Sequence, residues 1–132
     1  MKNKGIKIVG LIFLLGFSLS GYSQGNIINQ VKEAIKTGSS KEIAQYLHPQ
    51  VDVTINGEMG NYSKTQAEYV LREFFQENPP SSFTIVHQGA SKGGLPYAIG
   101  QYLSDGSTFR VWMRIKNLDD RYLVHEISFI KE

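Results

Sequence analysis

A strict two-residue alternation over residues 107–116 constrains this chain more than any other feature of its sequence. One set of side chains in the segment is entirely apolar: Phe109, Val111, Met113 and Ile115. The other set joins three cations to a tryptophan: Arg110, Trp112, Arg114 and Lys116. Successive side chains of a β-strand point to opposite faces, so the pattern predicts a strand with one buried and one open face. The chain therefore has to build a sheet that is covered on one side only.

Further segments indicate more strands of the same sheet, at residues 82–89, 97–103 and 121–130. Turn-forming residues separate the last of these strands, with Ser104-Asp105-Gly106 before residue 107 and Asp119-Asp120 after residue 116. An earlier hairpin is predicted around Asn56-Gly57, because both residues tolerate the positive φ that a two-residue hairpin turn requires.

Helical spacing of apolar residues precedes these strands over residues 26–37, 39–48 and 63–78. The second and third segments begin with serine followed three residues later by Glu42 or Gln66, which is the spacing of a capping box. Runs of helices and of strands, rather than strict alternation, are typical of an α+β domain. We therefore expect three helices packed on one face of a strongly curved antiparallel sheet.

The N-terminal residues 1–23 have the three parts of a secretory signal peptide. Three lysines precede an apolar run of 12 residues, and small residues follow it ahead of Gln24. A spanning helix needs about 20 apolar residues, so cleavage is favoured over an uncleaved anchor, although the anchor remains an alternative. We expect export to a bacterial periplasm or exterior, with no membrane anchor after cleavage and one domain over residues 24–132.

Charge and cysteine content exclude several classes of function. Loss of residues 1–23 leaves 11 basic against 12 acidic side chains, without the basic surface of a nucleic-acid-binding protein. The chain has no cysteine, which excludes disulfides and thiolate ligands, and its three histidines show no metal-ligand spacing. We expect no cofactor and no metal.

The order of the elements resembles the nuclear transport factor 2-like superfamily, which has a cystatin-like fold. The segments "GSSKEIAQYLHPQVDVTING", "PYAIGQYLSDGSTFRVWMRIK" and "VHEISFIKE" are similar to a small exported bacterial family within it, domain of unknown function (DUF) family 4783. The resemblance implies a cone made by three N-terminal helices and a bent sheet, with a pocket at its wide end. Relatives in the superfamily often dimerise through the outer face of the sheet. The resemblance brings no known activity.

Strand alternation assigns the side chains expected inside this cone. The expected inward set is Phe83, Ile85, His87, Tyr97, Ile99, Gln101, Leu103, Phe109, Val111, Met113, Ile115, Leu123, His125, Ile127 and Phe129. Its polar members need a partner or water, because an unpaired buried polar group is costly. The candidates for lining a pocket, which would hold a small molecule or peptide, are Tyr46, His87, Tyr97, Gln101 and His125. The alternative is that the histidines bind backbone or tyrosine groups and nothing else.

An aromatic patch rimmed by charge is expected on the outer face of the sheet. Its members are Tyr102, Arg110, Trp112, Arg114 and Tyr122, with Glu126 placed to pair with one of the arginines across strands. Such a patch is typical of an association surface, here of a homodimer. A solvated face with packed cross-strand aromatics is the alternative.

Two classes of function remain open at this point. The first is a non-catalytic domain that binds a small ligand or acts as a dimeric interaction module, and the sequence favours it. The second is a cofactor-free lyase or isomerase, as implied by superfamily enzymes such as ketosteroid isomerase, with His87 or His125 as the base. Asp52 and Glu126 are expected to point outward, so no carboxylate is predicted at an inward strand position. A third possibility is assembly through the sheet with no pocket function.

Overall fold

The sheet has six strands in the order β2-β1-β6-β5-β4-β3 in a computed structural model that describes residues 24–132. The predicted signal peptide, residues 1–23, lies outside the described residues. The strands are β1 (Leu47–Ile55), β2 (Glu58–Ser63), β3 (Ser82–Ala90), β4 (Pro96–Ser104), β5 (Ser107–Leu118) and β6 (Arg121–Lys131). The helices are α2 (Gln24–Thr37), α3 (Ser40–Ala44) and α4 (Lys64–Glu77).

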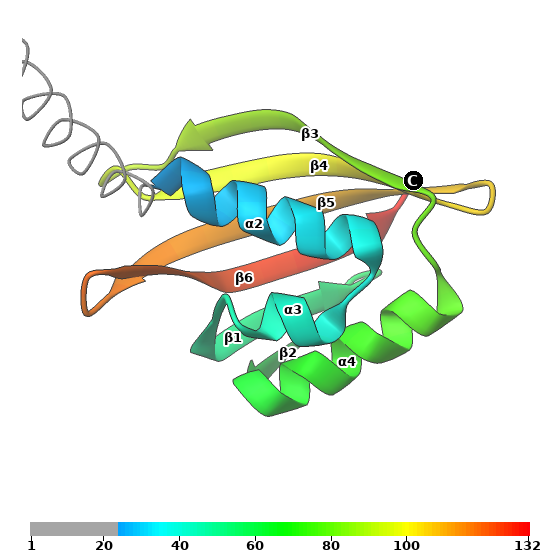
Figure 1. Cartoon of the computed structure of the whole chain (residues 1–132), viewed down its shortest axis with the longest axis horizontal. Coiled ribbons are helices and arrows are strands. Elements are labelled where there is room, and N and C mark those ends of the chain that lie inside the picture. Colours follow the sequence, from blue (N-terminus) through cyan, green and yellow to red (C-terminus); the bar gives the residue numbers. More distant parts are fainter. Residues whose placement is uncertain (1–23) are drawn as a thin grey trace, which may run out of the picture.

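Four of the five strand pairs are antiparallel, as predicted, whereas β1 pairs with β6 in parallel. A hairpin turn dictates the antiparallel direction only between consecutive strands. The long stretch between β1 and β6 imposes no such direction, and so the sequence did not indicate the parallel pair. The three helices lie on one face of the curved sheet, α2 over β3 to β6 and α4 against β1 and β2 (Figure 1). Within residues 24–132, no helix has the length and apolar character needed to cross a membrane.

Both predicted serine caps are present. The Ser39 hydroxyl accepts the Glu42 backbone N–H at 3.1 Å, and Ser63 and Gln66 form a complete capping box at the start of α4. The second helix is shorter than predicted, since α3 ends at Ala44 and β1 already begins at Leu47. The segment after α3 is held by the sheet, because the Tyr46 carbonyl accepts the Val124 N–H at 2.8 Å.

The predicted inward face of β5 is correct. Its four alternating apolar residues are at most 2% exposed, namely Phe109, Val111, Met113 and Ile115. The end of the core beneath α4 is aromatic, with the Phe74 ring 5.2 Å from the Phe109 ring and 4.4 Å from the Phe129 ring, centre to centre. This packing anchors α4 to the inner face of the sheet.

The predicted faces of β4 are reversed. Ala98 and Tyr102 are fully buried in the core, whereas Gln101 and Leu103 are exposed on the outer face, which they share with Tyr97 and Ile99. The turn before β5 has two residues rather than three, because Ser104 pairs with Ser107 across Asp105 (φ 39°) and Gly106 (φ 85°). This register sets even-numbered residues of β4 beside odd-numbered residues of β5.

Two β-bulges change the faces of β3 and β6. A shift between Ile85 and His87 moves His87 to the outer face, contrary to the prediction. A second shift opposite Arg114 and Ile115 leaves His125 as the extra residue of β6. As a result Val124 belongs to the main core cluster, where Leu123 was predicted. Ile127 and Phe129 lie inward as predicted.

Candidate functional site

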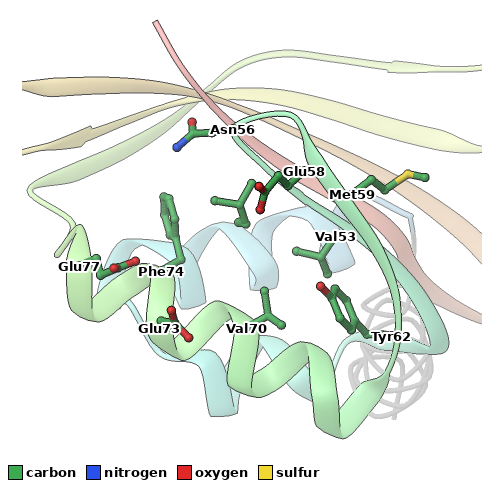
Figure 2. A pocket seen from close by; sticks show the side chains of 10 residues that line it. Val53, Asn56, Glu58, Met59, Tyr62, Val70, Glu73, Phe74 and Glu77 are labelled. Atoms are coloured by element: carbon green, nitrogen blue, oxygen red, sulfur yellow. The ribbon is translucent and has the colours of Figure 1, made fainter.

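A pocket of about 760 Å³ lies between α4 and the β1–β2 hairpin (Figure 2). Its size is within the range typical of sites for small organic ligands, roughly 300–1,000 Å³. The side chains that line it come from β1, the hairpin turn, β2 and α4: Val53, Ile55, Asn56, Glu58, Met59, Tyr62, Val70, Glu73, Phe74 and Glu77. We call this hollow the α4–hairpin pocket.

The hairpin wall of the pocket is fixed at its tip. Asn56 (φ 50°) and Gly57 (φ 92°) form the predicted two-residue turn, with Ile55 paired to Glu58. The Asn56 backbone N–H donates to the Phe129 carbonyl at 2.8 Å, and its side-chain oxygen accepts the Lys131 N–H at 3.0 Å. At its other end β2 passes into α4 directly through the Ser63 cap. The two walls are therefore positioned by local sequence signals and by β6.

The lining combines apolar and aromatic side chains with three carboxylates. Ile55, Tyr62 and Val70 contribute apolar surface, and the Tyr62 ring lies over Gly60, where a Cβ atom would meet the ring at 2.4 Å. Glu58 stands on the hairpin side, and Glu73 and Glu77 stand on the helix side (Figure 2). No lysine, arginine or histidine lines the pocket among the described residues. The lining can therefore hold an apolar body and carries only negative charge.

None of the residues predicted to line a pocket lies in the α4–hairpin pocket. His87, Tyr97 and Gln101 are all on the outer face of the sheet, because of the β3 bulge and the β4 register described above. His87 is exposed there, with its Nε2 atom 3.0 Å from the Tyr97 hydroxyl. Tyr46 borders a separate surface groove between α2 and α3. The expected gathering of these side chains inside the cone is wrong.

His125 is half-buried in a small hollow of about 120 Å³ that Tyr97, Trp112 and Arg114 also line. Burial lowers the pKa of His125 below its ordinary value, and the positive charge of Lys116 lowers that pKa further. The hollow is smaller than typical sites for small organic ligands. His125 shares this hollow with Tyr97, Trp112 and Arg114 of the outer face, so it does not face the inside of the cone as predicted.

The outer sheet face carries the charged groups and the tryptophan predicted for it. The Arg114 guanidinium lies 5.1 Å from the centre of the Trp112 ring, and its Nε atom is 3.7 Å from Glu126. Arg110 forms a second ion pair, at 2.9 Å, with Glu132. The Tyr97 ring lies 5.7 Å from the Trp112 ring, centre to centre. The prediction had placed Tyr102 and Tyr122, and not Tyr97, beside Trp112.

Two tyrosines predicted for the outer patch lie inward. Tyr102 is fully buried and donates its hydroxyl hydrogen bond to the Asn78 carbonyl. Tyr122 packs against the main core, since the β6 bulge reverses the face of the residues before it. Both corrections have the same cause, namely a register that side-chain alternation within one strand does not reveal.

The sequence carried signals for the α4–hairpin pocket that the prediction did not use. An Asn-Gly hairpin running directly into a capped helix places the two elements side by side. Glu73 and Glu77 stand four residues apart on that helix, on one face with Val70. Within residues 24–132, no three His, Asp or Glu side chains lie close enough together to hold a metal ion.

Helices on one face of a curved six-stranded sheet give the chain the fold of nuclear transport factor 2-like (NTF2-like) proteins. A crystal structure of an NTF2-like protein of unknown function from Shewanella baltica superposes with a TM-score of 0.62 at 12% identity, covering 83% of this chain and 90% of that one. A de novo designed protein with a curved β-sheet superposes with a TM-score of 0.63 at 16% identity, covering 78% and 94%. At these identities the likeness shows the fold alone.

The chain belongs to the family called domain of unknown function DUF4783, whose model matches residues 28–129. A DUF4783 crystal structure from Bacteroides ovatus is 32% identical, with a TM-score of 0.74, and the alignment covers 78% of this chain and 93% of that one. A second one, from Bacteroides uniformis, is 29% identical with the same TM-score and covers 79% and 95%. A search among curated proteins gave no match.

Proposed function

We propose that this chain is an exported, non-catalytic domain that binds a small organic ligand in the α4–hairpin pocket. The observation that carries the proposal is the pocket itself, about 760 Å³ in volume and lined by apolar, aromatic and carboxylate side chains. Binding sites are typically concave, with polar groups that orient the ligand. The lining of this pocket exposes more polar than apolar surface. The basic and apolar parts of residues 1–23 support export. The mass of the protein isolated from its host tests export, since cleavage removes about 23 residues.

The geometry gives less support to the lyase or isomerase hypothesis. That hypothesis required a histidine base inside the cone, within reach of a tyrosine hydroxyl. His87 does have a tyrosine hydroxyl as its neighbour, but the pair is exposed on the outer sheet face. No histidine among the described residues lines the α4–hairpin pocket. Binding without chemical change is the function we propose for this pocket.

A substitution that fills the pocket tests the proposal. Val70 lines the pocket and is only partly buried, so Val70→Trp would occupy the hollow with little disturbance of the core. The neighbouring Tyr69 is 60% exposed, which makes Tyr69→Trp a matched control on the same helix. Native mass spectrometry of the proteins purified from the original host would show a bound small molecule in wild type and Tyr69→Trp. Its retention by Val70→Trp, or its absence from all three proteins and from a fragment screen, would contradict the proposal.

A specific observation also favours the interaction module, with a second copy of this chain as the partner. The outer sheet face carries both members of two ion pairs, Arg110–Glu132 and Arg114–Glu126, around Trp112. A surface with both signs of charge can complement itself in an isologous contact about a twofold axis. Nearby, Leu103 is 38% exposed and Ile130 is 48% exposed. Such a contact would remove the apolar surface of both residues from water.

Solution mass tests this second candidate. We expect the wild type to be a dimer by light scattering and Trp112→Asp to be a monomer with unchanged secondary structure. Leu118→Asp, at the half-buried end of the same strand, serves as a control for a new charge on β5. A monomeric mass for the wild type at millimolar concentration would rule out the dimer.

A further inference from the structure

We infer that the ligand of the α4–hairpin pocket is an organic cation, an ammonium or guanidinium group attached to an apolar body. The inference rests on the proposed function, because it names the class of ligand for the same pocket. Three features of the described residues lead to it: uncompensated charge, a local conflict on α4, and apolar surface between the carboxylates.

The carboxylates of the pocket lack cationic partners. The ion pairs of the described residues involve Glu33, Glu68, Glu126 and Glu132, and neither Glu58, Glu73 nor Glu77 takes part in one. Elsewhere on α4 the same residue type is paired, since Glu68 lies 3.2 Å from Arg72. The three carboxylates are exposed to solvent, and no cationic side chain of the described residues pairs with them.

Helix α4 places two of these carboxylates where helix electrostatics disfavours them. Glu73 and Glu77 are four residues apart on one face, and like charges at this spacing repel. Glu77 is also the last residue of α4, where the helix dipole favours cations, and the last turn carries no basic residue. A sequence that breaks a local rule twice at one pocket is typical of a functional site. A bound cation would relieve both conflicts.

The space between the carboxylates is suited to an apolar body rather than to a bare ion. The half-buried side chains of Ile55, Tyr62 and Val70 present apolar surface to the hollow. Buried Val53 and Phe74 lie behind them (Figure 2). Aromatic faces attract organic cations as well as apolar groups. The carboxylates come from opposite walls, and among residues 24–132 no cluster of three acidic or histidine groups is tight enough for a metal ion. An extended organic cation fits this arrangement.

Three probes with one apolar body and different charge test the inference: 4-phenylbutylamine, 4-phenylbutanol and 4-phenylbutanoate. Their affinities would be measured by NMR titration of the mature protein, following the methyl signals of Val53, Met59 and Val70. We expect the amine to bind at least about fivefold more tightly than the alcohol, because one or more partly exposed ion pairs add about this factor to the affinity. We expect the butanoate to bind more weakly than the alcohol, and added salt to weaken only the amine.

Charge-neutralising variants assign the preference to the pocket. Glu73→Gln combined with Glu77→Gln should lower the amine affinity to that of the alcohol and leave the alcohol affinity unchanged. Glu68→Gln makes the same chemical change on α4 away from the pocket and should leave the amine preference intact. If the alcohol or the butanoate binds as tightly as the amine, the cation inference fails while the proposed binding function stands. If none of the three probes binds at 10 mM, the cation inference fails, and the fragment screen and host-purified protein decide the proposed binding function. An amine preference that survives the double variant would also overturn the inference.

Discussion

Replacement of Tyr102 by phenylalanine tests the β4 register, on which the assignment of the two sheet faces depends. The Tyr102 side chain is fully buried against Phe74 and Phe109, and its hydroxyl donates a hydrogen bond to the Asn78 carbonyl just beyond α4. Tyr102→Phe keeps the ring and removes only this bond. The expected loss in the free energy of unfolding at pH 7 is about 0.5–1.5 kcal/mol, with about 1–3 kcal/mol as the limit if the carbonyl finds no other partner.

The pH dependence of the same variant is more diagnostic than its stability at neutral pH. Burial raises the pKa of the Tyr102 phenol well above its unfolded value of 10.0. Because the folded pKa is the higher one, the stability from this group is fully present below pH 10 and falls as the pH rises above it. The unfolded chain then releases a proton that the folded chain keeps, and the expected slope is about 1.4 kcal/mol per pH unit.

Urea unfolding between pH 7 and pH 11.5 measures both effects. The wild type should lose about 1 kcal/mol more than Tyr102→Phe between pH 10 and pH 11, and the slope approaches 1.4 kcal/mol per pH unit only above that range. Tyr69→Phe removes a phenol that is 60% exposed and should follow the wild type at both ends of this pH range. Parallel alkaline curves for wild type and Tyr102→Phe, together with equal stability at pH 7, would mean that Tyr102 faces solvent and that the register is wrong.

Three further changes test other parts of the structure. Glu77→Gln removes a negative charge from the C-terminal end of α4 and should raise the free energy of unfolding by about 0.3–1 kcal/mol, as measured by urea unfolding. A loss of stability would refute the conflict between Glu77 and the helix dipole. Burial lowers the pKa of His125 below 6.5, so the free energy of unfolding should fall as the pH drops from 6.5 toward the folded pKa. His125→Gln should lessen this fall, and identical stability curves for wild type and variant in acid would contradict the burial of His125. Ser63→Ala should cost about 1 kcal/mol through the lost cap of α4, and an unchanged urea midpoint would show that the capping box is dispensable.

The accuracy of the sequence predictions differs between local and long-range features. The caps at Ser39 and Ser63 and the Asn56-Gly57 turn were predicted correctly, because each depends on a few adjacent residues. The inward face of β5 was also correct, since four large apolar side chains alternate there with charged ones. In β4 the alternatives were close in hydrophobicity, with Ile99 and Leu103 on one face and Ala98 and Tyr102 on the other.

The candidate site was not predicted because its walls come from elements that the sequence analysis treated separately. Four members of the predicted pocket set, His87, Tyr97, Gln101 and His125, depended on single-strand alternation, and one turn and two bulges moved them to the outer face or to its edge. Each bulge inserts one residue, which inverts the face of every residue on one side of it. Val86 and His125, the two extra residues, carry no glycine or proline signal that would have marked them.

By itself, the sequence determined the α+β class, the buried face of β5, and the positions of the helices and strands except for the short α3 and the early start of β1. These features follow from periodicity and capping, which act over a few neighbouring residues. Only the tertiary structure decided the parallel pairing of β1 with β6, the faces of β4, and the placing of Glu58 opposite Glu73 and Glu77. These depend on how distant segments align, and the choice between alternative registers is made by packing over the whole sheet rather than by any one segment.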